Sequence, residues 1–174
     1  MSKPILVTYA SRAGSTTGVA EEIARTLTEQ GAQVELRPMQ EITDLAPYSA
    51  VVAGSAIQRG KWLPEAMEFI EKYQDALAYK PFAAFQVCMT LSVKNEKFAS
   101  IVPDWLEPVR VLVKPVCEGF FAGALDISKV PSFWDRVKFR LSVLFGVWTE
   151  GDHRNWNAIH AWAAAVKPML EDSH

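Results

Sequence analysis

The sequence has few cysteines, little net charge and no long apolar run. Its only cysteines, Cys88 and Cys117, lie far apart in apolar stretches, which favours buried, reduced thiols over a disulfide or a redox pair. A net charge of −2 argues against a generally basic nucleic-acid binder. No run reaches 18 apolar residues, and the amino terminus lacks the apolar region and cleavage site of a signal peptide. We therefore expect one cytoplasmic domain over 1–174, with no nucleic-acid partner.

Patterns for metal binding and for a side-chain nucleophile are missing as well. His153, His160 and His174 have no metal-ligand spacing with one another or with a cysteine, so no metal is expected. No Ser-His-Asp or Cys-His arrangement can be recognised from spacing. Near the carboxyl end, Asp152 is predicted to cap a helix and Arg154 to pair with a carboxylate.

The most informative feature is an apolar, β-rich segment, 4–9, followed by a loop of small and hydroxyl residues and then a helix. The N-terminus of a helix attracts anions, because its free N–H groups and its dipole both favour negative charge. Neither the Gly-Lys-Ser/Thr of a Walker A loop nor the three glycines of a dinucleotide fingerprint occurs here. The loop is therefore predicted to hold one terminal phosphate through neutral donors. The alternative is an ordinary strand–helix turn capped by Ser and Thr.

Strand and helix patterns alternate along the chain, which predicts a doubly wound parallel sheet. The predicted strands are 4–9, 33–37, 49–55, 81–88 and 114–122. The predicted helices are 14–30, with Gly31 as its C-cap, 63–77, 94–112 with breaks near Pro103 and Pro108, and 155–170. Ligands of such sheets bind beyond the carboxyl ends of the strands. The loops 11–16, 55–62 and 88–93 should therefore converge on one site.

The loop after the third predicted strand carries groups suited to a flat, charged ligand. Trp62 could stack on a ring, Arg59 and Lys61 supply positive charge, and Gly60 accepts an unusual backbone conformation. The alternative for Trp62 is that it begins the next helix and packs locally.

Four segments resemble the flavodoxin family, most of all its branch of quinone-dependent protoporphyrinogen dehydrogenases. The segments 9–16 and 52–60 point to flavin mononucleotide (FMN), and 121–125 and 133–136 point to the branch. The resemblance implies an α/β flavodoxin-like fold, with a five-stranded parallel sheet in the order 2-1-3-4-5 and helices on both faces. It also implies noncovalent FMN, which carries the chemistry without a catalytic side chain of the protein.

By this resemblance, three loops contribute the residues that bind FMN. The first loop holds the phosphate, and the other two flank the isoalloxazine ring. The residues are Ser11, Arg12, Ala13, Gly14, Ser15 and Thr16; Ser55, Ala56, Ile57, Gln58, Arg59, Gly60, Lys61 and Trp62; and Val87, Cys88, Met89, Thr90, Leu91, Ser92 and Val93. Unlike the aromatic sandwich of classical flavodoxins, the third loop has no aromatic residue.

A helical insertion is predicted at about 126–150, before the last helix. Its apolar residues fall on one stripe at helical spacing: Trp134, Val137, Leu141, Leu144, Phe145 and Trp148. Between Lys129 and Trp148, four cations face a single acid, a local charge of +3 that leaves −5 for the remainder. Such a helix is typical of a membrane-surface or apolar-ligand element. The alternative is that the stripe packs on the core of its own domain.

These features together predict an FMN-dependent oxidoreductase of the protoporphyrinogen dehydrogenase type that passes electrons to a quinone. Arg59, Lys61, Arg136 and Arg140 are candidates to bind substrate carboxylates. Residues 132–148 are candidates for peripheral contact with the inner face of the membrane. One alternative is a non-enzymatic carrier that serves redox partner proteins, and another is a ligand-binding domain that has lost the flavin.

Overall fold

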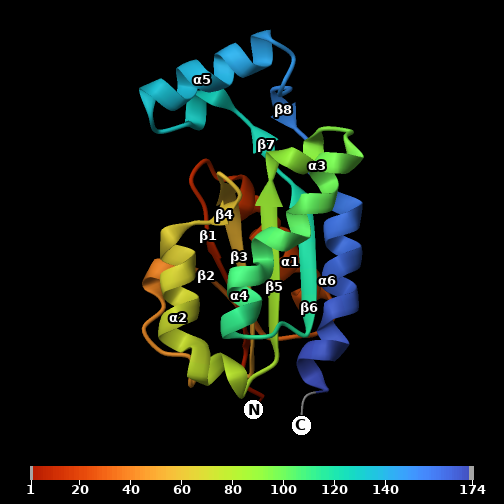
Figure 1. Cartoon of the computed structure of the whole chain (residues 1–174). Helices are drawn as coiled ribbons and strands as arrows, with labels where there is room; N and C mark the ends of the chain where they lie inside the picture. Colours follow the sequence, from red (N-terminus) through yellow and green to blue (C-terminus); the bar gives the residue numbers. More distant parts are fainter. Residues whose placement is uncertain (1, 173–174) are drawn as a thin grey trace.

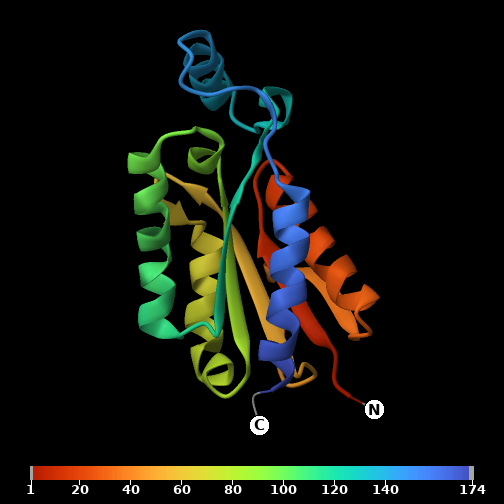
Figure 2. The same ribbon diagram turned by 90° about the vertical axis from the view of Figure 1, so that its right-hand side faces the viewer.

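In the computed structural model, which describes residues 2–172, five parallel strands lie between two layers of helices (Figures 1 and 2). The strands are β1 (Ile5–Ala10), β2 (Val34–Pro38), β3 (Ala50–Gln58), β5 (Phe82–Cys88) and β6 (Cys117–Ala122), with a short β4 (Lys61–Trp62). The helices of the body are α1 (Ser15–Glu29), α2 (Pro64–Ala78), α3 (Glu96–Ile101), α4 (Glu107–Leu112) and α6 (Trp156–Glu171). Short 3₁₀ turns are η1 (Met39–Glu41), η2 (Met89–Ser92) and η3 (Val102–Leu106).

The parallel strands run in the order β2-β1-β3-β5-β6, which is 2-1-3-4-5 when β4 is set aside. The predicted fold class and strand order are therefore confirmed. Two separate cores explain the layering: one lies under α2 and α4, and the other under α1 and α6. Every residue of β5 is buried, as expected for a strand that is covered on both faces.

Two predicted boundaries need correction. The third strand extends beyond Ser55 to Gln58 and folds back into β4 as a hairpin, with Gln58 opposite Lys61. The fifth strand begins at Cys117 rather than at Lys114, because Pro115 lacks the N–H that a ladder requires. The break predicted near Pro103 is present, since η3 separates α3 from α4, and α4 begins with Pro108 in its first turn.

A buried polar pair links the hairpin to the centre of the sheet. Trp62 is 4% exposed, and its indole Nε1–H donates to Oε1 of the fully buried Gln86 at 3.0 Å. The amide nitrogen of Gln86 donates to the carbonyl of Val102 at 2.6 Å. The side chain of Gln86 in strand β5 thus joins strand β4 to the turn η3.

An arm extends beyond the carboxyl edge of the sheet, between β6 and α6 (Figures 1 and 2). It consists of β7 (Ala124–Leu125), η4 (Ile127–Lys129), α5 (Phe133–Leu144) and β8 (Gly151–Asp152), with β7 and β8 paired antiparallel at its base. Helix α5 is shorter than the predicted insertion, because it ends in a turn where Gly146 has φ +71°. Within residues 2–172, no helix has the length and apolarity needed to cross a membrane.

We predict that Gln86→Leu destabilises the fold by about 2–4 kcal/mol, because it leaves both the Trp62 N–H and the Val102 carbonyl buried without partners. Urea unfolding measures the change. Gln74→Leu, the same substitution at an exposed position of α2, is the control and should stay within about 0.5 kcal/mol of the parent. Equal stabilities of the two variants would contradict a structural role for this pair.

Candidate functional site

The carboxyl edge of the sheet brings the three predicted loops close together. In the strand register, Ala10 is opposite Ser55, Ala56 is opposite Val87, and Cys88 is opposite Ala122. The loops that follow β1, β3 and β5 therefore leave the sheet side by side. This is the juxtaposition that parallel pairing predicted from the sequence.

The loop after β1 leaves the N-terminus of α1 free of a side-chain cap. Gly14 occupies the N-cap position with φ +88°, a conformation that a residue with a Cβ adopts only with strain. The Gly14 N–H donates to Oγ of Ser11 at 3.1 Å, which fixes the curve of the loop. The first N–H groups of α1 have no partner within the helix, so an anion placed here would satisfy them.

A buried hydroxyl without a partner lies in the first turn of the same helix. Thr16 is fully buried, and its Oγ1 makes no hydrogen bond. Buried hydroxyls of folded proteins nearly always have a partner, so an orphan at a helix N-terminus indicates that a ligand supplies one. The Oγ of the preceding residue, Ser15, lies close to Gly123, because a Cβ added to Gly123 would be 3.3 Å from it.

Arg12 is engaged by the protein itself rather than free for a phosphate. Its guanidinium forms a two-pronged ion pair with the carboxylate of Glu65 at the start of α2, and Nη2 lies 2.8 Å from Oε2. This hydrogen bond from Arg12 lowers the pKa of Glu65 against the opposing effect of burial. The pair joins the phosphate loop to α2, and it leaves the loop with mainly neutral donors.

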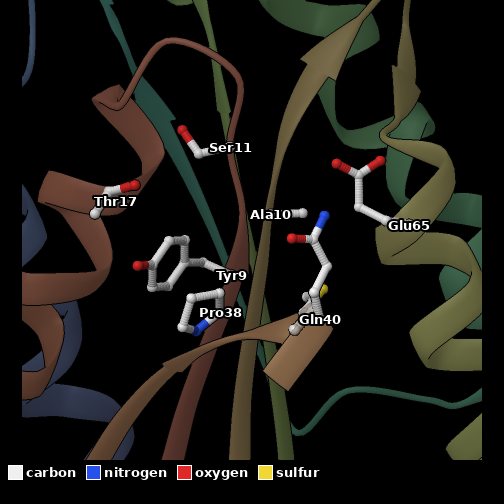
Figure 3. Close-up of a pocket in the computed structure, with 8 residues that line it drawn as sticks. Tyr9, Ala10, Ser11, Thr17, Pro38, Gln40 and Glu65 are labelled. Carbon is white, nitrogen blue, oxygen red and sulfur yellow. The ribbon is translucent and has the colours of Figure 1, made fainter. Parts of the chain in front are cut away.

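Glu65 also lines a small pocket of about 110 Å³ between the ends of β1 and β2 (Figure 3). Tyr9, Ser11 and Thr17 line one side of the pocket, and Gln40 lies near Glu65. Only Ser11 among these residues was a sequence-predicted site residue. Gln40 was missed because it reaches the pocket only through the pairing of β1 with β2, and Glu65 because it lies on α2.

The hairpin after β3 ends in two residues with positive φ, Arg59 at +52° and Gly60 at +71°. Two such residues make the mirror-image turn that matches the twist of a two-residue hairpin. The ring of Trp105 lies against the tip, because a Cβ on Gly60 would be 2.9 Å from its Nε1. Trp105 is partly exposed and was not predicted as a site residue from the sequence. The one signal for it was its position beside the helix break at Pro103.

The structure corrects the expectation that Trp62 stacks on a ligand. Its ring is part of the core under α2, because β4 turns it inward toward Gln86. Ser55 is also fully buried, and its hydroxyl accepts from the Leu63 N–H and donates to the Ala56 carbonyl, which closes the base of the hairpin. These two side chains therefore shape the loop from beneath. Of the hairpin residues, Gln58, Arg59 and Lys61 are exposed, and Ala56 and Ile57 are half-buried.

The segment after β5 is only partly accessible. Val87 and Cys88 are buried, whereas Met89, Thr90, Leu91 and Ser92 form the half-buried turn η2, followed by the half-buried Val93. Burial raises the pKa of the Cys88 thiol to about 11, so the thiol is protonated at neutral pH. Both cysteines are free, and Cys117 is less buried than the sequence predicted. Gly123, another residue that the sequence did not predict, lies between Ser15, Val87 and Met89.

Arg154 supports the phosphate loop from the side of α6. It pairs with Asp152 through two hydrogen bonds of 2.8 and 2.6 Å, and its Nη1 lies 3.5 Å from the Ser15 carbonyl. The predicted pairing of Arg154 with a carboxylate is confirmed. The predicted cap is wrong, because Asn155 and not Asp152 accepts from the N–H of the first turn of α6.

The remaining candidates lie apart from these loops. Arg136 and Arg140 are on α5, where Nε of Arg136 is buried without a partner and Arg140 is exposed. His153 and His160 bond to Thr149 and Thr26, and His174 lies outside the described residues. Within residues 2–172, no cluster of three or more His, Cys, Asp or Glu is placed to hold a metal ion.

The fold and this edge define a doubly wound α/β domain with an anion-binding turn after its first strand. Residues 6–152 match the model of the family described as "Flavodoxin domain", and the chain belongs to that family. Comparison with curated proteins found no match.

Solved structures with the same fold include flavodoxins and an oxidoreductase. A flavodoxin from the domain Archaea has 15% identity and a TM-score of 0.56, covering 97% of this chain and 99% of that one. An oxidoreductase from Corynebacterium diphtheriae has 10% identity and a TM-score of 0.54, covering all of both chains. Flavodoxin 1 from Bacillus cereus has 17% identity and a TM-score of 0.52, covering 82% of this chain and 97% of that one. At these identities the likeness establishes the fold.

We predict that the Arg12–Glu65 pair contributes up to about 1 kcal/mol at neutral pH, since both partners remain partly exposed. The pKa of Glu65 is lower in the folded state than in the unfolded state, where it is about 4.3. The stabilisation by the pair is therefore complete above the unfolded pKa, and it is lost as the pH falls through the folded pKa. The stability difference between the parent and Glu65→Gln should therefore shrink as the pH falls below about 4.

Urea unfolding across this pH range, in a double-mutant cycle with Arg12→Gln, measures the coupling. Glu68→Gln is the matched control, because Glu68 is exposed on the same helix and makes no ion pair in the described structure. If the stability difference between the parent and Glu65→Gln did not change with pH, the ion pair would not be the source of that difference.

Proposed function

We propose that the protein binds FMN at this edge and acts as a redox flavoprotein. The observation that carries the proposal is the uncapped N-terminus of α1 with the orphan hydroxyl of Thr16 beside it. Membership in the flavodoxin domain family supports the same ligand. The donors at this turn, hydroxyls and free N–H groups, fit a phosphate monoester. There is also open space beside the loop, since a Cβ added to Gly14 would meet no atom within 4 Å.

In this proposal the loops after β3 and β5 enclose the flavin ring. Bound FMN would supply electron transfer, in one-electron or two-electron steps. The tip of the hairpin presents the Arg59–Gly60 peptide, and the ring of Trp105 lies against it. Met89 and its neighbours in η2 offer partly exposed, non-aromatic groups on the other side. The protein therefore positions the ring and limits its contact with water.

The specific activity that we propose is oxidation of protoporphyrinogen with a quinone as the acceptor. The segments 121–125 and 133–136 support it by their resemblance to that branch, and the second of them lies on the arm. The arm stands at the same end of the sheet as the three loops (Figure 1). Arg136 and Arg140 on α5, with Arg59 and Lys61 on the hairpin, are the cations that we propose for the substrate carboxylates.

A non-enzymatic electron carrier is the second candidate. The exposed Arg59 and Lys61 at the hairpin tip favour it, because they would offer a redox partner protein a cationic docking point near the ring. Anaerobic incubation of the FMN-loaded protein with protoporphyrinogen and a quinone separates the two candidates. Turnover supports the enzyme, whereas reduction and oxidation only by partner proteins supports the carrier. A colourless protein that does not take up FMN would refute both.

Replacing Ser15 and Thr16 together with Ala should weaken FMN binding at least about tenfold. Two phosphate donors are lost, and hydrogen bonds to charged groups are worth about 1.5–3 kcal/mol each. Quenching of flavin fluorescence gives the dissociation constant. Thr28→Ala, at the far end of α1, is the control and should bind FMN as the parent does. Unchanged affinity in a folded double variant would place the phosphate elsewhere.

Gly60→Ala should shift the reduction potentials of bound FMN while changing its affinity less than about tenfold. A side chain here is strained at φ +71° and would displace Trp105, so the peptide at the hairpin tip must move. Gly146→Ala is the control for backbone strain alone. Gly146 has the same φ as Gly60, but a Cβ added there would have no atom within 4 Å. Potentials unmoved in Gly60→Ala would mean that the hairpin only encloses the ring.

A further inference from the structure

The apolar stripe of α5 does not pack on the body of the protein. None of the helix residues is buried, and α5 packs mainly against η4 at the base of its own arm. Phe133 is 67% exposed, Trp134 72%, Leu144 78% and Phe145 77%. The alternative considered for the sequence, a stripe buried in the core of its own domain, is therefore not what the structure shows.

This exposure is concentrated rather than scattered. Of the thirteen large apolar side chains that are exposed within residues 2–172, six fall between Phe133 and Val147. Isolated exposed apolar residues are ordinary on a protein surface, but a contiguous group marks an interaction site. Of the stripe, Trp134, Val137, Leu141 and Leu144 lie on one side of α5, and Phe133 adds to that side. Phe145 is the C-cap of the helix, and Trp148 lies in the turn beyond it.

Cations border this stripe. At 100° per residue, Lys138 falls beside one edge of the stripe, and Arg136 and Arg140 fall beside the other. Arg140 has no ion-pair partner among the described residues, and Lys138 reaches only Asp135, at 3.8 Å. The rest of the chain is net negative. An anionic surface would therefore attract the arm and repel the body, which fixes the orientation of approach.

We propose that α5 docks the protein on an anionic phospholipid bilayer, with its apolar stripe in the headgroup region and its cations against the lipid phosphates. Aromatic residues at the two ends, Trp134 and Phe145, suit the interface because such side chains favour the boundary between water and acyl chains. A helix of this length lies in the plane of the surface rather than across it. The proposal depends on the exposed stripe and not on FMN.

Sedimentation with sucrose-loaded vesicles tests the proposal, using phosphatidylcholine alone and a 7:3 mixture with phosphatidylglycerol, at roughly physiological salt. The parent should pellet with the anionic vesicles at least about tenfold more strongly than with the neutral ones, since each surface cation contributes about fivefold. Because the flavin takes no part in docking, apo and FMN-loaded protein should behave alike. Failure of FMN binding would then leave this result unaffected.

Trp134→Ala with Phe145→Ala should lower binding to the anionic vesicles at least about tenfold, because two interfacial anchors are lost. The melting temperature should stay within about 2 °C of the parent, since both side chains are mostly exposed and Trp134 contacts only the ring of its equally exposed neighbour Phe133 among the described aromatic pairs. Tyr79→Ala with Val111→Ala is the matched control, because both residues are highly exposed but lie outside the arm. It should bind as the parent does.

Lys138→Gln with Arg140→Gln should weaken binding roughly tenfold or more and reduce its dependence on salt. Lys72→Gln with Lys114→Gln removes two exposed cations elsewhere and should have little effect. A parent that stays in the supernatant with anionic vesicles would overturn the proposal. So would binding that survives both α5 substitutions, or a dimer in sedimentation equilibrium that Trp134→Ala with Phe145→Ala dissociates, because the stripe would then be covered by a second copy.

Discussion

The burial of the central strands on both faces is the constraint on which the rest of the structure depends. Strands β1, β3 and β5 carry apolar side chains toward two cores, so helices must cover both faces of the sheet. Each connection between parallel strands therefore crosses one face of the sheet and returns the chain to the amino edge, where the next strand begins. The loops that leave the strands collect at the opposite, carboxyl edge, where polar and flexible residues are tolerated. The proposed FMN site exists because the core places these loops together.

Much of the architecture could be predicted from the sequence, because alternating strand and helix patterns have few compatible topologies. The anion-binding turn could also be predicted, since its signal is local: hydroxyl residues and Gly14 between a strand and a helix. The roles of the two tryptophans near the hairpin could not be predicted from the sequence. Trp62 faces inward because β3 continues past Ser55 and pairs with β4, and Trp105 reaches Gly60 through a long-range contact. The hairpin's only local signal is Gly60, and the contact of Trp105 with Gly60 has none.

For the arm, the sequence predicts an amphipathic helix but not the direction of its apolar stripe. A stripe facing the core and one facing solvent have the same periodicity, because periodicity records only that one side is apolar. The direction depends on where β7 and β8 place the base of the arm, and on how little of the body lies beneath α5. Similarly, the sequence identifies Arg12 as a cation beside a phosphate loop, but only the fold brings Glu65 within reach of it.

The neck of the arm is closed twice, by the β7–β8 ladder and by a hydrogen bond of 3.1 Å from the His153 N–H to the Gly123 carbonyl. All strands of the main sheet precede this neck in the chain, and α6 begins shortly after it. Closing a loop costs entropy that grows only slowly with its length. An inserted segment of any size can therefore lengthen, shorten or change its chemistry here without shifting the register of a single strand. The neck makes the surface that the domain presents to its surroundings an exchangeable part, on which selection can act independently of the core and of the loops at the carboxyl edge.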